Sequence, residues 1–547
     1  MTNKSSFSFG LLLITGLGFS AISLNADSQL VTATSQQQLL SPDQWYQQGQ
    51  KTAHRLSAGD SFPVTGKNII LFIGDGMSIS TITAARILAG QQKGGFGEEN
   101  TLVFERFPHT ALAKTYNTNQ QTPDSAGTMS AIMTGVKTKA GVIAMDGEVL
   151  LGDCESGKGH EAPTLLERAE TAGMNTGVVT TARLTHATPA ATYAHSVMRD
   201  WESDADIPKS ERAKGCRDIA RQLIEFPFGD GLEVALGGGR RNFLPRSMPD
   251  PEYPQQQGKR LDGRNLMDEW QKQRPHAASV WNKKQFDAIN PEQTRHLLGL
   301  FEPKHMQYEH DRPNDTGGEP ALHEMTAKAL DILQADGKPF FLMVEAGRID
   351  HAHHAGNAYR ALTDTIELDR AVATALKKVD LNNTLIIVTA DHSHTFNMAG
   401  YPQRGNPILG KVMHNDKHGQ PAHIMMRDAQ NKPYTTLGYQ NGPGYINGDQ
   451  RPDLTHVDTE APDYKQAAAI PLHSETHSGE DVAVFANGAG SQGVHGVFEQ
   501  NVLYHLMLQS HPEILGIDHT LQQLEGQRSL SALKNIDQLI KTRQPKS

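Results

Sequence analysis

The 547-residue chain has only two cysteines, four tryptophans and no excess of basic residues. Two distant cysteines are too few for a zinc site built from thiolates, and they lack its spacing. Lysine and arginine number 51 against 61 acidic residues, which gives a formal charge of -10. Because no basic stripe is available to neutralise phosphates, we expect no nucleic-acid partner.

Long apolar runs are also scarce, and the one candidate lies at the N-terminus. Lys4 precedes an apolar run over 9–24, and Ala26 offers a small residue for cleavage. This pattern is typical of a signal peptide over residues 1–26. The alternative is a membrane anchor, but the run is broken by Gly, Ser and Thr and is short for a span of about 20 residues. We therefore expect a periplasmic or secreted protein, without stable membrane insertion after signal cleavage.

The expected state of the two cysteines, Cys154 and Cys216, depends on the compartment of the protein. In a cytosolic protein they would be free thiols, whereas in an exported chain a disulfide is favoured. Closing a loop of this length would contribute roughly 4 kcal/mol in the chain-entropy model.

Five continuous apolar runs predict buried parallel strands. They lie at residues 68–73, 177–181, 339–344, 384–389 and 481–485. Helical patterns separate them, at residues 78–89, 163–172, 321–335 and 358–379. This alternation predicts an α/β fold with a central, mostly parallel β-sheet flanked by helices on both faces.

The length alone would allow two or three domains. We instead predict one catalytic domain over residues 27–515, because two regions that lack the alternation of strands and helices resemble insertions on its core. These loop-rich insertions cover about 240–320 and 398–471. Residues 516–547 are predicted to form a polar, helical C-terminal tail.

Polar side chains collect just past the predicted strands, where ligands bind in parallel sheets. The segment from Asp350 to His354 contains three histidines and an aspartate, and its two ends share one face of a helix. A single histidine there could be a solvated residue, but three histidines and an aspartate in one short segment favour a metal site. The other candidates are Asp75, Glu345, Asp391, His392 and His477.

Ser125 lies where a turn leads directly into a predicted helix. The free N–H groups and the positive end of the helix dipole would stabilise an alkoxide or a phosphate there. An ordinary N-cap serine is the commoner interpretation. The surrounding metal-ligand types favour a nucleophile in metal-assisted phosphoryl transfer instead.

The motifs together resemble the alkaline phosphatase family over roughly residues 40 to 510. They are Gly74-Asp-Gly-Met77, Pro123-Asp-Ser-Ala-Gly127, His186-Ala-Thr-Pro189, the run from Val344 to His354, the run from Thr389 to His394, and the run from Glu475 to Asp481. The pattern is similar to the animal-type enzymes, because His186 and His351 replace the Asp and Lys of the enteric bacterial form. The spacing of Cys154 and Cys216 also resembles a disulfide of the animal enzymes.

The resemblance implies two zinc ions and one magnesium ion per chain. The first zinc would bind Asp350, His354 and His477. The second would bind Asp75, Asp391 and His392, with the Ser125 oxygen as a further ligand. Magnesium would take Asp75, Thr188 and Glu345, as suits a cation that prefers oxygen. His186 would orient a magnesium-bound water without contacting the ion itself.

Further roles follow from the same resemblance. Arg199 would grip the phosphate through its planar guanidinium, with Asp124 holding the arginine in place. His351 would reach the phosphate through water. Tyr401 matches a residue that enters the neighbouring subunit's site, so we expect a homodimer.

A fourth, calcium-like site is also suggested by the resemblance. Its ligands would be Glu252, the Phe301 carbonyl, Glu302 and Asp315, although the spacing beyond Glu309 departs slightly from the animal pattern. Solvated loop acids are the alternative interpretation.

These features imply a metal-dependent alkaline phosphatase that hydrolyses small phosphate monoesters through a phosphoserine intermediate. Alternatives within the superfamily are a phosphodiesterase or a sulfatase, but the residues after Ser125 lack the Cys/Ser-x-Pro-x-Arg context of sulfatases. A zinc-binding or scavenging protein is an alternative of another class. It would explain the ligands but not a serine at a helix N-terminus.

Overall fold

The computed structural model describes residues 40–57, 66–446, 451–525 and 529–543. The predicted signal peptide, residues 1–26, lies outside the described residues. Among the helices of the described ranges, none combines the length and the apolar character needed to cross a bilayer.

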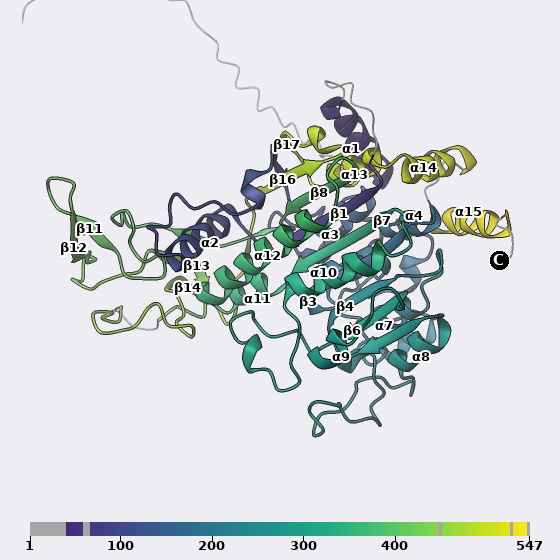
Figure 1. Cartoon of the computed structure of the whole chain (residues 1–547), viewed down its shortest axis with the longest axis horizontal. Coiled ribbons are helices and arrows are strands. Elements are labelled where there is room, and N and C mark those ends of the chain that lie inside the picture. Colours follow the sequence, from purple (N-terminus) through teal and green to yellow (C-terminus); the bar gives the residue numbers. More distant parts are fainter. Residues whose placement is uncertain (1–39, 58–65, 447–450, 526–528, 544–547) are drawn as a thin grey trace, which may run out of the picture. The chain divides into compact units, whose positions relative to one another are not determined.

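A ten-stranded sheet forms the centre of the described chain (Figure 1). Its strand order is β17-β2-β16-β8-β1-β7-β3-β4-β6-β5. The bounds are β1 Asn68–Gly74, β2 His109–Lys114, β3 Asn175–Arg183, β4 Val234–Gly238, β5 Ala277–Val280, β6 His296–Leu300, β7 Phe340–Ala346, β8 Thr384–Thr389, β16 Val482–Gly488 and β17 Gly496–Glu499. Four of the five predicted apolar runs lie in the parallel strands β1, β3, β7 and β8.

The fifth apolar run forms a strand whose direction differs from the predicted one. Strand β16 pairs antiparallel with both β8 and β2, so the prediction of a parallel strand at residues 481–485 is wrong. Most of its apolar residues are buried, and Phe485 is partly buried. A continuous apolar run reports that a strand is buried, while its direction depends on the connection that brings the chain back to the sheet.

The helices form two layers around the sheet. Helices α10 and α12 pack on each other and on the central strands, in front of the sheet in Figure 1. Helices α3, α4 and α5 form a second packed group behind it, and α4 and α5 contact β3 and β7. The helix bounds are α1 Pro42–Ser57, α2 Ile79–Gln92, α3 Ser125–Thr134, α4 Leu165–Thr171, α5 Ala187–Tyr193, α6 Lys209–Ala213, α7 Ile219–Ile224, α8 Leu266–Gln273, α9 Lys283–Asp287, α10 Leu322–Leu333, α11 Arg348–His354, α12 Ala358–Lys378, α13 Val502–Ser510, α14 Pro512–Glu525 and α15 Leu530–Arg543.

Local signals explain where the predicted helices begin. The Ser78 side chain accepts a hydrogen bond from the Thr81 N–H and caps α2. Thr164 and Glu167 form a reciprocal capping box at the start of α4. Asn357 caps α12 by accepting from the Arg360 N–H.

The two regions without a strand–helix alternation in the sequence differ in how they relate to the central sheet. Residues 240–320 contribute β5 and β6 to the central sheet, together with α8 and α9, which the pattern did not predict. Residues 398–471 contain short strands away from that sheet. Two small sheets occur here, β10-β13-β14 and β11-β12, with bounds β10 Phe396–Met398, β11 Met413–Asn415, β12 Pro421–Met425, β13 Leu437–Gly442 and β14 Ala468–Pro471.

The C-terminal segment is helical, as predicted, through α14 and α15. Both helices contact α4, and they bury apolar side chains such as Leu521 and Leu533. The segment is therefore packed against the catalytic part of the chain.

Candidate active site

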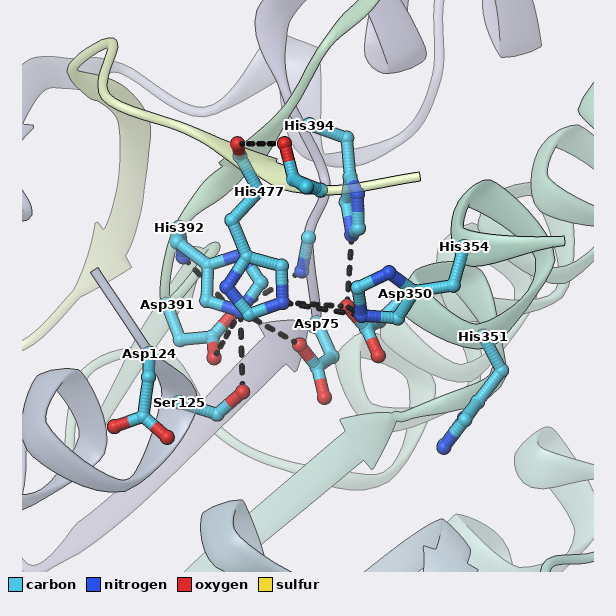
Figure 2. A network of polar contacts seen from close by, with 12 residues as sticks. Asp75, Asp124, Ser125, Asp350, His351, His354, Asp391, His392, His394 and His477 are labelled. Atoms are coloured by element: carbon cyan, nitrogen blue, oxygen red, sulfur yellow. Dashed lines mark hydrogen bonds and ion pairs between the residues drawn. The ribbon is translucent and has the colours of Figure 1, made fainter. Parts of the chain in front are cut away.

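The predicted ligands come from neighbouring strands at one edge of the sheet. Asp75 follows β1, Glu345 lies in β7, and Asp391 and His392 follow β8. Since β8, β1 and β7 are adjacent and parallel, their carboxyl ends meet at one place. Helix α11 brings in Asp350 and His354, and the short strand β15 (His477–Ser478), which pairs with β9 (Ser393–His394), brings in His477 (Figure 2). Ser125 and Thr188 come from α3 and α5.

Asp350, His354 and His477 form the first group of ligands. The Nε2 atoms of the two histidines lie 3.2 Å apart, and each lies 3.2 to 3.3 Å from Asp350 Oδ1. Their Nδ1 atoms face the backbone carbonyls of Glu475 and Pro123, so in the neutral rings Nδ1 carries the proton. Two Nε2 lone pairs then point at one another and at a carboxylate. About 3.3 Å is the separation of two ligand atoms around tetrahedral zinc with bonds of about 2.0 Å, so this group fits a cation.

The second group surrounds Ser125. His392 Nε2 lies 3.1 Å from Ser125 Oγ, 3.3 Å from Asp391 Oδ2 and 3.5 Å from Asp75 Oδ1. His392 Nδ1 faces the Ser393 carbonyl, which again leaves the Nε2 lone pair directed at carboxylates. The nucleophile candidate therefore shares a cation-binding group with three predicted zinc ligands.

The third group contains oxygen ligands. Ligand atoms of Asp75, Glu345 and His186 lie within 4.8 Å of one another. Thr180 Oγ1 donates to Glu345 Oε2. Thr188 Oγ1 and the second Glu345 oxygen are both buried without a hydrogen bond of ordinary geometry to the described residues, although Thr188 and Asp75 lie close enough to oppose the burial that raises the pKa of Glu345. An oxygen-rich group with unused acceptors suits magnesium.

Burial makes these carboxylates dependent on a cation. It is the main cause that raises the pKa of Asp75 well above its ordinary value, and nearby carboxylates add to the shift. Burial likewise raises the pKa of Glu345 to about 7. Neither Asp75 oxygen is hydrogen-bonded by a donor of the described chain. Buried carboxylates of this kind are stable when they coordinate metal ions.

The histidine ligands are in the form that binds metal. Burial lowers the pKa of His392 well below its ordinary value, and it also lowers the pKa of His354. Both rings are therefore neutral at physiological pH, with a lone pair free to coordinate.

Helix α3 begins at Ser125, as the sequence predicted. Asp124 caps the helix, because its Oδ1 accepts from the Gly127 N–H at 3.1 Å. Ser125 is 2% exposed, so its hydroxyl faces the buried ligand groups rather than bulk water. The helix dipole adds a positive partial charge at the same place.

Arg199 lies beside this helix start. Its NH1 donates to Asp124 Oδ2 at 2.5 Å, and its NH2 donates to His186 Nε2 at 3.1 Å. Although burial raises the pKa of Asp124, Arg199 holds it below its ordinary value. His186 Nδ1 is buried, and no described residue bonds to it. The structure thus brings together Asp124, Arg199 and His186.

His351 belongs to a further group, in which one of its ring nitrogens lies within 4.8 Å of ring nitrogens of His186 and His305. The His351 ring is 5.4 Å from the His186 ring and 4.0 Å from the ring of His305, a residue that the sequence analysis did not select. Tyr401 is 94% exposed and has a positive φ of 56°.

Sequence reasoning also missed His394 and Glu475 as site residues. His394 Nε2 lies 2.8 Å from Asp350 Oδ1, and its Nδ1 lies 2.5 Å from Glu475 Oε2. Although burial lowers the pKa of His394, the two carboxylates raise it to about 10. The alternating spacing of His392 and His394 was the available signal, since both side chains of such a pair can be buried at the end of a strand.

The suggested calcium ligands also lie together. Glu302 has its pKa raised to about 8, first by burial and then by Glu252 and Asp315. Both Asp315 oxygens are buried, and no donor in the described ranges reaches them. Glu252 is already bonded by Arg240 NH2 at 2.8 Å. Phe301, whose carbonyl was proposed, is buried next to Glu302 just after β6.

The predicted disulfide is present. Cys154 and Cys216 are bonded, with Cα atoms 5.8 Å apart. This confirms the pairing that the exported-chain hypothesis favoured.

A serine at a helix N-terminus that faces two imidazole-containing ligand groups and one oxygen-rich group is the arrangement of a metal-dependent phosphoryl-transfer enzyme. The comparisons with known proteins agree. The profile of the family described as alkaline phosphatase matches residues 66–511. The tissue-nonspecific isozymes of alkaline phosphatase from Gallus gallus and Homo sapiens are 46% and 43% identical to this chain, over 85% of it and 88% of each relative.

Solved structures show the same fold. The alkaline phosphatase of Thermus thermophilus superposes with a TM-score of 0.57 at 25% identity, over 83% of this chain and 95% of that one. The alkaline phosphatase of the Antarctic bacterium TAB5 gives a TM-score of 0.55 at 24% identity, over 82% and 99% of the two chains. The chain therefore belongs to the alkaline phosphatase family, a family of hydrolases that use divalent metal ions.

Proposed function

We propose that this protein hydrolyses phosphate monoesters through a phosphoserine at Ser125 and releases inorganic phosphate and an alcohol. One observation carries the proposal. The Ser125 hydroxyl begins a helix and lies 3.1 Å from His392 Nε2, within a group of buried carboxylates that needs a cation. Family membership supports the same reaction.

We further propose two zinc ions and one magnesium ion per chain, held by the three ligand groups described above. When bound, these ions supply Lewis-acid stabilisation of the nucleophile, the leaving group and the negative charge that the reaction develops. The facing Nε2 lone pairs of His354 and His477 support a cation in the first group. The oxygen-only donors Thr188 and Glu345 support magnesium in the third.

The protein's own groups then divide the reaction into two steps. Ser125 Oγ attacks phosphorus, and the bond to the leaving alcohol breaks on the opposite side. The Arg199 guanidinium binds two non-bridging oxygens, and Asp124 keeps it oriented through a bond of 2.5 Å. The free N–H groups at the start of α3 face the new phosphoserine.

In the second step a water molecule attacks phosphorus from the side that the alcohol has left. The bond to Ser125 Oγ breaks, and inorganic phosphate forms. Covalent catalysis of this kind replaces one difficult displacement by two easier ones.

Assembly and location belong to the proposal as well. The almost fully exposed Tyr401 supports a homodimer in which this side chain reaches the neighbouring subunit. The unused Asp315 oxygens support a calcium ion with Glu252, Phe301 and Glu302. We propose secretion or export to the periplasm after cleavage of residues 1–26, which accords with the disulfide.

Hydrolysis of an aryl phosphate monoester, measured beside the matching diester and sulfate ester, tests this function. We expect turnover of the monoester to dominate, to be lost with a chelator, and to accompany about two zinc ions and one magnesium ion per chain. A preference for the diester or sulfate would overturn the proposal. Metal binding without any turnover would identify a zinc-binding protein instead.

A further inference from the structure

The apolar residues on either side of Arg199 pack outside the main hydrophobic core, although a backbone bridge between Ser196 and Ile143 also ties this segment to that core. A second, separate cluster of buried residues lies beside that core, and we call it the satellite core. It consists of Val142, Met145, Val149, Cys154, Val197, Trp201 and Ile207, with Met198 and Cys216 packed against it. The segment that carries Arg199 therefore has its apolar contacts in the smaller cluster.

Two satellite-core residues hold the backbone on either side of Arg199. Val197 and Trp201 are 3% and 4% exposed, so the chain is anchored two residues before and two residues after the arginine. The guanidinium between these anchors extends to Asp124. The arginine thus depends on the packing of its neighbours for its place.

The loop at residues 139–152 fixes both partners of this ion pair. Arg199 N donates to Gly141 O at 2.8 Å, while Gly141 N donates to Asp124 Oδ1 at 2.7 Å. One residue therefore sets the position of the arginine backbone and of the carboxylate that orients its side chain. Gly152 N also donates to Val197 O at 3.2 Å, which ties the end of the loop to the same segment.

The disulfide closes this assembly. Cys154 belongs to the satellite core, and Cys216, 62 residues later, packs against it. The loop that the bond encloses contains Arg199. Cys154 N also donates to Glu211 Oε2 at 3.0 Å, so the two ends of the loop are joined by a covalent and a polar contact.

We infer that the Cys154–Cys216 disulfide and the satellite core position Arg199, and that they set the enzyme's affinity for the phosphoryl group. The inference rests on the proposed function, in which Arg199 binds phosphate oxygens. Apart from Ser125, Thr188 and His477, the proposed metal ligands lie on or directly after β1, β7, β8 and α11, elements that contribute apolar residues to the main core. Loosening the satellite core therefore changes phosphate binding while the metal ligands keep their places.

The size of the effect follows from the chemistry of the arginine. Its bidentate contact with two phosphate oxygens demands correct orientation. Complete loss of these charge-assisted hydrogen bonds would weaken phosphate binding roughly 10- to 100-fold. A loosened loop loses only part of this contact, so we expect roughly a 3- to 10-fold weakening of phosphate binding.

The main test is the double variant Cys154→Ala/Cys216→Ala, purified and measured with its bound metal ions. The inhibition constant for inorganic phosphate and the KM should rise by roughly 3- to 10-fold, with kcat changed by less than about twofold. Bound zinc and magnesium should equal those of the wild type. An unchanged inhibition constant, or a loss of metal that accounts for the change, would overturn the inference.

A milder matched pair keeps the test usable if the cysteine variant does not fold. Ile207→Val removes one methyl group from the satellite core, and Ile332→Val removes the same group from the main core, at the end of α10. Only Ile207→Val should weaken phosphate inhibition. Equal effects of the two variants would show a general loss of stability rather than positioning.

Combination with Arg199→Ala separates this inference from the proposed function. If the disulfide acts through Arg199, its removal should have no further effect on phosphate inhibition in the Arg199→Ala background. A full, additive effect there would overturn the positioning role. If Arg199→Ala itself leaves phosphate inhibition unchanged, the proposed function of the arginine fails, and that result is visible without the cysteine variants.

Discussion

The metal-ligand groups and the phosphate-binding arginine are built in different ways. Asp75, Glu345, Asp391 and His392 stand at the ends of adjacent strands of the central sheet, whose side chains are buried on both faces. Arg199 stands on a loop segment held by the satellite core and one disulfide. Buried charges need rigid, preorganised surroundings, and the sheet supplies them. The substrate contact needs only one well-placed side chain, and a small cluster is sufficient for that.

Removal of the metal ions should give the largest effect in this comparison. Exhaustive chelation should lower activity by at least about 10³-fold, because the buried carboxylates lose their counter-ions and the nucleophile its activation. It should also lower the melting temperature, since ions that bind only the folded state stabilise it. Activity assays and thermal scans of chelated and reconstituted protein measure both. Full activity of metal-free protein would refute the metal-dependent mechanism.

Ser125→Ala should come next. Turnover should fall by at least about 10³-fold, because the covalent route is lost, yet it should exceed the uncatalysed rate since the bound metals remain. Peptide mapping after incubation with inorganic phosphate in mild acid should find the phosphate on Ser125 in the wild type only. Metal content should stay close to that of the wild type. Phosphate on another residue, or wild-type turnover of the variant, would contradict the mechanism.

Arg199→Ala should have a smaller and more specific effect. Loss of charge-assisted hydrogen bonds of about 1.5–3 kcal/mol corresponds to a roughly 10- to 100-fold weaker inhibition by phosphate. Because the arginine is attached to the satellite core, the metal content should not change. Inhibition constants and metal analysis check this, and Arg183→Ala serves as the matched control. Arg183 is bonded to Glu202 rather than Asp124, so the control should leave the bound metals in place and weaken phosphate inhibition less.

The smallest effect concerns His195, four residues before Arg199. His195 bonds to Glu167 of α4 at 2.9 Å and to the Ala144 carbonyl at 2.7 Å. Although burial lowers the pKa of His195, Glu167 raises it above the ordinary value overall. A raised pKa stabilises the fold fully below the unfolded pKa of about 6.5, and this contribution disappears as the pH rises through the folded value.

His195→Gln should therefore lower the melting temperature more at pH 6 than at pH 10. A loss of roughly 1 kcal/mol at pH 6 would correspond to a shift of a few degrees for a chain of this size. Thermal unfolding of both proteins at the two pH values measures the difference. An equal shift at both would show that His195 contributes by packing alone.

Much of the fold was predictable because its signals are local. The runs that became β1, β3, β7 and β8 are continuous and apolar, and the helices between them carry capping residues such as Ser78 and Asn357. Strands β4, β5 and β6 were not predicted, because they are short and two of them are rich in Gly or Ala. Such segments become strands only when a neighbouring strand pairs with them.

In the candidate site, too, local signals identify some residues and not others. Asp75 and Asp391 could be selected because each directly follows a predicted strand. Arg199 could not be chosen over Arg183 by spacing, and it was selected through resemblance alone. The structure separates the two arginines, since Arg183 pairs with Glu202 while Arg199 reaches Asp124 next to the nucleophile.

The sequence by itself determined the alternation of β1, β3, β7 and β8 with helices, and with it the collection of carboxylates and histidines at one end of the sheet. This follows because apolar periodicity, capping and residue position after a strand are properties of a few consecutive residues. Only the tertiary structure decided the reversed direction of β16, the contact of His394 with Asp350 and the attachment of Arg199 to the satellite core. Each of these depends on contacts between segments far apart in the chain, which no local pattern encodes.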